Sequence, residues 1–354
     1  MTIAPKRARA GRPPAGPLGI LAAVAAAAGL AGCGGEPGGR VVVVYSSQDR
    51  EFAGPVLSAY GQRAGVEVLP KFDVESTKTV GLARLLIQES PRPRCDVFWN
   101  NEILNTIRLQ EKGLLASWSP PNAADLPDEF RARDRTWYGF AARARVLLVN
   151  TELVAPADRP TSLADLTDPR WKGKVAIAKP LFGTTATHFT CLHVAWGQEK
   201  TRAFLADLKT NQVRVLSGNK QVARAVSSGQ AAFGLTDTDD AMEELEAGRP
   251  VAIVYPDRRP DQLGTLFIPN VVAIPKGAPH RAEAEALGDA LLSPAVEAEL
   301  ARGPSAQIPL NRKTQAPARV ETPRTVHAMP ADFEAAARIW DRVAAELAAT
   351  FAGP

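Results

Sequence analysis

Five consecutive polar residues, Thr236 to Asp240, follow an apolar run that ends at Leu235. Apolar residues then recur at helical spacing, so this segment predicts the end of a strand and the start of a helix. Its three carboxylates could coordinate a hard cation or accept hydrogen bonds from an amine or hydroxyl group of a ligand. The competing interpretation is structural: Thr236 or Asp237 caps the helix, and the next acidic residues favour its dipole. We interpret the segment as a candidate ligand site.

Similar polar segments follow the other predicted strands. In open α/β sheets, ligands bind beyond the carboxyl ends of the strands, and the helix N-termini there attract anions. Each of these residues alone could be only a helix cap. Their recurrence at successive strand ends predicts a shared cleft. The candidate ligand-binding residues are Ser46, Ser47, Ser76, Thr77, Asn100, Asn101, Gly183, Thr184, Thr185, Asn219, Thr236, Asp237 and Thr238.

The sequence contains no recognisable catalytic set. His188 and His193 are five residues apart, a spacing that does not place two metal ligands on one helix face. Neither a GxSxG nor a Walker A motif occurs. Asp239 and Asp240 are adjacent, so they point apart on a helical turn and are poorly placed as an acid and base pair. We therefore predict a protein with no catalytic residues, and an exported hydrolase is a remote alternative.

Strand and helix patterns alternate from residue 40 to residue 113, which predicts a parallel sheet with helices on its faces. A second alternating series follows, and two extended segments run through residues 137–150 before it. A further extended stretch lies near residues 265–274, so the chain crosses twice between the two series. Two crossings make a hinge, and the cleft beneath a hinge is where a ligand binds. The predicted fold is α/β with two lobes: residues 40–143 and 270–354, including the C-terminal helices, form lobe 1, and residues 144–269 form lobe 2.

The first 32 residues have the features of a targeting segment. Basic residues precede an apolar run of about 15 residues, which is short for a membrane-spanning helix and typical of a signal peptide. The run ends in Leu-Ala-Gly-Cys at residues 30–33, which resembles a bacterial lipobox. We therefore predict a lipoprotein signal peptide at residues 1–32, a lipid anchor on Cys33 and a flexible tether at residues 33–39. A plain secretory signal with a chance cysteine is the alternative.

Charge and cysteine content narrow the class of protein further. The formal net charge of +4 equals the charge of the four basic residues in the targeting segment, so the remaining chain is neutral. This balance argues against a nucleic-acid partner. Cys95 and Cys191 have no metal-binding spacing, and we expect buried thiols rather than a disulfide.

Several longer segments resemble the extracellular solute-binding proteins of ABC importers. These segments are VVVYSSQD, CDVFWNNE, PRWKGKVAIAKP, FGTT, SGNKQVARAVSSGQAAFGLTDTDDA and IPNVVAIPKGAPH, and the resemblance covers about residues 40–310. The most similar group is the ferric-iron-binding class, which also contains phosphonate, thiamine and sugar-phosphate binders. The resemblance implies the type 2 periplasmic binding protein fold, with two mostly parallel α/β lobes joined by a two-strand hinge. It implies a monomer on the periplasmic or extracytoplasmic side that passes a small solute to an ABC permease and its ATPase.

The resemblance also implies roles for individual residues. The tyrosine pair that binds Fe(III) in iron-binding members falls here on Asp239 and Asp240. Asp49 stands where some members have a histidine, and Asn101 or Glu102 stands where they have a glutamate. All four tyrosines, at positions 45, 60, 138 and 255, lie elsewhere. The implied metal ligands are therefore Asp49, Glu102, Asp239 and Asp240. The implied contacts to a synergistic anion or a phosphoryl group are Gly183, Thr184, Thr185 and Asn219.

Two classes of solute fit these residues. One is ferric iron or another metal, with or without a bridging anion; it would be the transported solute and not a resident cofactor. The other is an organic phosphate or phosphonate. Its phosphoryl group would contact Ser46, Ser47, Thr77, Thr184, Thr185 and Asn219, with Lys78 favouring the anion. A sensor domain that partners a membrane kinase is a further alternative.

Overall fold

The structure is a computed structural model that describes residues 39–73 and 80–351. The predicted signal peptide, Cys33 and nearly all of the tether lie outside the described residues, as do Ser76, Thr77 and Lys78. None of the helices in the described ranges is both long and apolar enough to cross a membrane.

The first series of elements alternates as predicted. The valine run of β1 lies at the centre of this part of the sheet, with Val42 and Val44 fully buried, and pairs in parallel with both β2 and β3. Gly65 ends the first helix in the left-handed conformation, with φ of 61°, as expected for a glycine C-cap. The elements are β1 (Val41–Ser46), α1 (Arg50–Ala64), β2 (Glu67–Phe72), α2 (Val80–Gln88), β3 (Val97–Asn100) and α3 (Leu104–Glu111).

Two strands connect this series to the next. The sequence predicts two extended segments within residues 137–150, whereas the structure has one buried strand, β4 (Trp137–Asn150). Its register with β9 (Phe267–Ala273) shifts between Phe140 and Arg143. Beyond this shift, β4 continues alongside the strands of the second series. The described sheet has the order β2-β1-β3-β9-β4-β7-β5-β6, and β8 pairs with β4.

The second series again places strands and helices in alternation. Strand β5 pairs in parallel with both β6 and β7. Each antiparallel pair in the described sheet involves β4 or β9, the two crossing strands. The elements are β5 (Val175–Ala178), α4 (Gly183–Ala195), α5 (Gln198–Thr210), β6 (Arg214–Leu216), α6 (Asn219–Ser227), β7 (Phe233–Asp237), α7 (Thr238–Glu246) and β8 (Val251–Val254).

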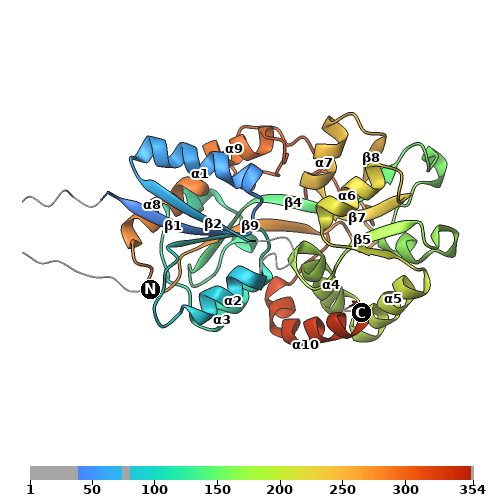
Figure 1. Cartoon of the computed structure of the whole chain (residues 1–354), viewed down its shortest axis with the longest axis horizontal. Coiled ribbons are helices and arrows are strands. Elements are labelled where there is room, and N and C mark those ends of the chain that lie inside the picture. Colours follow the sequence, from blue (N-terminus) through green and yellow to red (C-terminus); the bar gives the residue numbers. More distant parts are fainter. Residues whose placement is uncertain (1–38, 74–79, 352–354) are drawn as a thin grey trace, which may run out of the picture. The chain divides into compact units, whose positions relative to one another are not determined.

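Helices cover both faces of the sheet. In Figure 1, α1 and α8 (Arg281–Leu291) lie on one side of β1 to β3, and α2 and α3 lie on the other. The chain continues through α9 (Pro294–Arg302) and ends in α10 (Phe333–Phe351). Helix α10 contacts α3 of the first series and α4 of the second (Figure 1). The residue boundaries of the two lobes stay a prediction.

Short 3-10 helices and buried side chains complete the packing. The 3-10 helices span Pro121–Asp125, Asp128–Phe130, Pro156–Asp158, Leu163–Thr167 and Pro169–Trp171. Buried apolar residues form two large clusters. Cys95 and Cys191 are free and buried, which confirms the prediction of buried thiols. Burial raises the pKa of both thiols.

Candidate metal centre

The candidate site lies where β5, β6 and β7 end and where α4, α6 and α7 begin. Strand β7 ends at Asp237, and α7 begins at the next residue, as the sequence predicts. A narrow cleft opens there. Residues from the first series, Asp49 and Asn101, line it together with residues of the second series. The second-series residues that line it are Ala178, Lys179, Phe182, Gly183, Thr184, Thr185, Gly218, Asn219, Asp237, Asp239 and Asp240.

The structure excludes the helix-cap interpretation for Thr236 and Asp237. Asp237 occupies the N-cap position of α7, but its side chain makes no capping hydrogen bond. The Thr236 hydroxyl donates to the carbonyl of Asn219, so Thr236 does not cap α7 either. Thr238 accepts a hydrogen bond from the Ala144 amide of β4. Thr236 and Thr238 are therefore structural contacts, and neither lines the cleft.

Asp237 pairs with a buried arginine that the sequence analysis missed. Arg145 on β4 is 0% exposed, and its Nη1 lies 2.6 Å from Oδ1 of Asp237. The same guanidinium donates to the hydroxyls of Thr184 and Thr185, at 3.1 and 3.0 Å. It also donates to Oδ1 of Asn219 at 3.1 Å. Arg145 thus gathers the polar residues at the starts of α4, α6 and α7. We call Thr184, Thr185, Asn219, Asp237, Asp239 and Asp240 the second wall.

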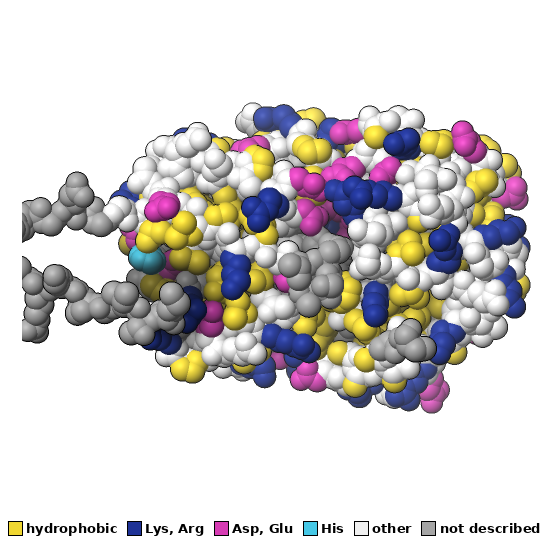
Figure 2. All heavy atoms as spheres, viewed as in Figure 1, with side chains coloured by type: hydrophobic (Ala, Val, Ile, Leu, Met, Phe, Trp, Pro, Cys, Tyr) yellow, Lys and Arg dark blue, Asp and Glu magenta, His cyan; other side chains and the backbone are white. Residues whose placement is uncertain are grey.

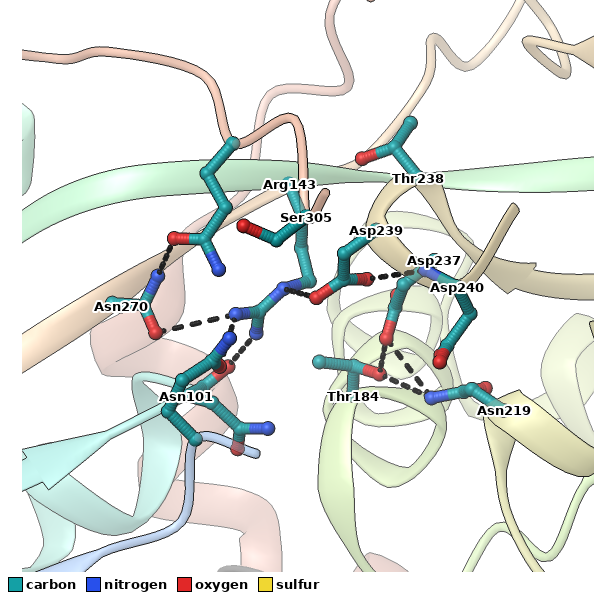
Figure 3. A network of polar contacts seen from close by, with 12 residues as sticks. Asn101, Arg143, Thr184, Asn219, Asp237, Thr238, Asp239, Asp240, Asn270 and Ser305 are labelled. Atoms are coloured by element: carbon teal, nitrogen blue, oxygen red, sulfur yellow. Dashed lines mark hydrogen bonds and ion pairs between the residues drawn. The ribbon is translucent and has the colours of Figure 1, made fainter. Parts of the chain in front are cut away.

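A second buried arginine, Arg143, lies two residues earlier on β4. Its Nε is 3.0 Å from Oδ2 of Asp239, and both side chains are buried (Figure 3). Its other nitrogens donate to the Asn101 carbonyl, to Oε1 of Gln48 at 2.8 Å and to Oδ1 of Asn270 at 3.2 Å. Arg143 therefore connects Asp239 to loops of the first series.

Charged residues inside an apolar strand are the signal that could have revealed both arginines. The fourteen residues of β4 are all buried, and a buried guanidinium requires an acidic or hydrogen-bonding partner. Arg143 and Arg145 are two residues apart, so they project from the same face of the strand. That face is the one that meets the aspartates.

The polar residues of the first series form a largely neutral surface. We call Ser46, Ser47, Asn100, Asn101 and Glu102 the first wall. The Ser47 hydroxyl is 2.8 Å from Oδ1 of Asn100 and 3.1 Å from Oδ1 of Asn101, and it accepts from the Asn101 amide. The Ser46 hydroxyl contacts the backbone of Gln48. These groups satisfy one another, and of this wall only Asn101 lines the cleft.

Glu102 belongs to the helix start rather than to the cleft. Its carboxylate accepts hydrogen bonds from the backbone amides of Leu104 and Asn105, at 2.7 and 3.0 Å. It also accepts from the Asn100 side chain and from the Thr187 hydroxyl of α4, at 3.0 and 2.9 Å. It is fully buried and does not line the cleft. The other three predicted metal ligands, Asp49, Asp239 and Asp240, do line it.

The acidic residues of the second wall are close enough to share one cation. One oxygen from each of Asp237, Asp239 and Asp240 lies within 4.8 Å of the others. Oxygen ligands of this kind suit hard metal cations. The histidines take no part: burial lowers the pKa of His188 and of His193, and neither lines the cleft.

Partly exposed charged groups of α1, α6 and α7 also pair with one another. On the face in Figure 2, acidic side chains gather near the middle beside basic ones, where Figure 1 places α6 and α7. In this region Lys220 of α6 forms an ion pair with Glu51 of α1 and another with Glu243 of α7, the latter at 3.1 Å. The first of these pairs joins the two series of elements.

Comparisons with known proteins agree with the fold. A protein-family profile described as bacterial extracellular solute-binding protein matches residues 106–335. Iron uptake protein A1 of Synechocystis is 27% identical over 284 residues, which cover 76% of this chain and 77% of that protein. The Fe(3+)-binding periplasmic protein of Serratia marcescens is 27% identical over 194 residues, 55% of this chain and 56% of that protein.

Solved structures give the same result for the fold. Iron-bound HitA from Pseudomonas aeruginosa superimposes with a TM-score of 0.78 at 22% identity, covering 87% of this chain and 99% of that chain. AfuA from Actinobacillus pleuropneumoniae, with fructose-6-phosphate bound, superimposes with a TM-score of 0.79 at 22% identity. The match covers 90% of this chain and 100% of the AfuA chain. The predicted α/β periplasmic binding protein fold is confirmed.

Proposed function

Since this chain belongs to the bacterial extracellular solute-binding proteins, which are not enzymes, we propose that it captures a metal cation for import. Ferric iron is the first candidate, because relatives that match most of the chain are named as iron uptake proteins. Members of this family act outside the cytoplasm. The proposal adds delivery of the cation to an ABC permease and its ATPase.

The convergence of three carboxylates in one cleft carries this proposal. Asp237, Asp239 and Asp240 offer oxygens within 4.8 Å of one another. Asp49 lines the same cleft from the other series of elements. Closure of such a cleft around a cation lets ligands from both sides complete the coordination. Asp49, Asp239 and Asp240 are the ligands we propose, because all three line the cleft and stand at the positions that the resemblance implies for metal ligands.

Metal binding to the metal-stripped protein tests the proposal. Ferric citrate and divalent metal salts are titrated while the thermal unfolding midpoint is followed, because a ligand present at a hundred times its Kd stabilises the folded state by about 2.7 kcal/mol. The variant Asp239→Asn/Asp240→Asn should lose this stabilisation. A matched control is Asp158→Asn/Glu152→Gln, which removes two charges from exposed residues outside the cleft. A double cleft variant that binds metal as well as the control does would overturn the proposal.

An organic phosphate or phosphonate is the second candidate. The observation that favours it is the buried Arg145, which lies at the starts of α4 and α6 among Thr184, Thr185 and Asn219. Helix N-termini and arginine are common phosphate-binding features. If Asp239→Asn/Asp240→Asn keeps its affinity for a sugar phosphate while wild-type protein shows no metal binding, this second candidate replaces the first.

The proposal includes the lipid anchor. Lipidation of Cys33 would hold the protein at the membrane next to its permease. Expression of the full chain and of Cys33→Ser in a bacterial host tests this part. We expect wild-type protein in the membrane fraction and the variant in the soluble extracytoplasmic fraction. Equal distribution of both proteins would contradict the anchor without affecting the solute proposal.

A further inference from the structure

We propose that the Asp237 carboxylate occupies the oxyanion subsite of this cleft, so the protein takes its cation without a separately bound anion. The inference rests on the proposed function for the identity of the solute. The subsite itself rests on the contacts of the second wall. Asp237 points away from the Arg143 and Asp239 pair and toward Thr184 and Asn219 (Figure 3).

The groups that would hold an external oxyanion all converge on Asp237. Oδ2 of Asp237 accepts from the Thr184 hydroxyl at 2.5 Å and from the Asn219 amide at 2.9 Å. Oδ1 accepts from Arg145 at 2.6 Å. A hydroxyl, an amide and a guanidinium around two carboxylate oxygens are the arrangement that a bound oxyanion requires.

The remaining side-chain donors of the second wall are also in use. The Thr185 hydroxyl donates to Oδ1 of Asn219 at 3.2 Å. The Asn219 amide also donates to the Thr184 hydroxyl oxygen at 2.8 Å. Arg145 donates further to both threonine hydroxyls. A phosphoryl oxygen that entered here would have to displace Asp237 or break several of these hydrogen bonds.

Electrostatics oppose an additional anion at this position. Asp237 and Arg145 form a neutral buried pair, with side chains 6% and 0% exposed. A phosphate beside them would meet the carboxylates of Asp239 and Asp240, whose oxygens lie within 4.8 Å of Asp237. Like charges at such distances in a buried site repel strongly. A cation meets a more favourable field there, because the carboxylates of Asp237, Asp239 and Asp240 outnumber the two arginines that pair with them.

The wild-type protein provides the first test. Metal-stripped protein is titrated calorimetrically with orthophosphate alone, and then with ferric citrate at a fixed citrate concentration in the presence and absence of millimolar orthophosphate. We expect no heat of binding from phosphate alone and an unchanged apparent Kd for iron. Binding of phosphate alone, or an iron Kd lowered about tenfold by phosphate, overturns the inference. Absence of any metal binding overturns the proposed function instead, and the phosphate titration still decides the inference.

A matched pair of variants provides the second test. Asp237→Ala removes the carboxylate and leaves Arg145, Thr184 and Asn219 around an empty space, whereas Asp237→Asn fills that space with a neutral group of the same size. Millimolar orthophosphate should raise the Tm of Asp237→Ala by about 3 °C or more. It should leave wild-type protein and Asp237→Asn unchanged. A folded Asp237→Ala that gains nothing from phosphate overturns the inference. If that variant does not fold, the wild-type titrations decide.

Discussion

The first wall and the second wall contain different kinds of polar groups. The first wall is built from serine and asparagine side chains that bond to one another, and its one carboxylate, Glu102, caps a helix. The second wall is built from aspartates paired with buried arginines of β4. Neutral groups cost little to bury when they are bonded to each other, whereas buried charges require a partner. The second wall, together with Asp49 of the first series, therefore carries the preference of the cleft for one sign of charge.

The difference also identifies which changes should be severe. Removing one member of a neutral hydrogen-bonded pair leaves an unsatisfied dipole, which costs about 1–3 kcal/mol. Removing one member of a buried ion pair leaves an unpaired charge, which costs about 3–5 kcal/mol.

Removing Arg145 is the most damaging change. Arg145→Met leaves the Asp237 carboxylate buried without its charged partner, among groups that are 0% to a few per cent exposed. We therefore expect the free energy of unfolding to fall by about 3–5 kcal/mol. Ser47→Ala on the first wall should cost about 1–3 kcal/mol. Urea denaturation of the metal-free proteins measures both. Equal losses in the two variants would show that the walls do not differ.

Acidification should destabilise the folded protein through His188. This side chain lies on α4, neither ring nitrogen has a hydrogen-bond partner within the described residues, and burial followed by the charge of Arg145 lowers its pKa. Below pH 6.5, its ordinary pKa, the unfolded chain gains a proton that the folded protein does not. Stability is therefore lost as pH falls, by about 1.4 kcal/mol per pH unit, until the folded pKa is reached.

The variant His188→Leu isolates this contribution. Its free energy of unfolding should fall less than that of wild-type protein between pH 7 and pH 5, because it lacks the titrating ring. Other groups titrate alike in both proteins, so the difference between the two curves reports His188 alone. Parallel curves would contradict the lowered pKa.

The sequence was sufficient for the elements and for most of the cleft lining. The β-branched run before Ser46, the glycine at position 65 and the polar residues after each strand are local signals, and the structure has a strand, a helix end and helix starts at these places. The residue types and their places after the strands also predict Asp239, Asp240, Thr184, Thr185 and Asn219 as site residues, and all five line one cleft. Their roles as ligands stay a prediction.

The pairing of these residues could not be obtained from the sequence. Arg145 is 92 residues from Asp237, and Thr184 is 53 residues from it, so only the folded sheet brings them together. Without the arginines, the acidic segment has the composition of a plain metal site. The arginines form ion pairs with two of these carboxylates: Arg145 pairs with Asp237, and Arg143 pairs with Asp239. The hydrogen bonds of Glu102 to a helix start likewise depend on a backbone geometry that residue types alone do not specify.

Replacing Arg143 should raise the affinity for a cation, in addition to the stability that is lost when one member of a buried ion pair is removed. Its guanidinium lies 3.0 Å from Asp239 and opposes any cation that approaches this carboxylate. Arg143→Gln retains a hydrogen-bond donor toward the first series and removes the charge. We expect its affinity for a metal cation to rise about tenfold, since a charge removed within a few ångströms of a buried site is worth at least about 1.4 kcal/mol. Calorimetric titration measures the change, and an unaltered or lower affinity would contradict it.

The smallest effect is expected for Lys220 on α6, which pairs with Glu51 on α1 and with Glu243 on α7. Both pairs are partly exposed, so each contributes at most about 1 kcal/mol, and salt weakens it. Because the Glu51 pair forms between the two series of elements, its loss should favour the open cleft. Glu51→Gln should therefore release bound metal up to about fivefold faster at low salt, and the exchanged pair Glu51→Lys/Lys220→Glu should recover part of the loss. Stopped-flow release into a chelator measures these rates. If Glu51→Gln releases metal at the wild-type rate at low salt, the Lys220–Glu51 ion pair contributes nothing to the free energy of cleft closure. The buried second wall would then account for it.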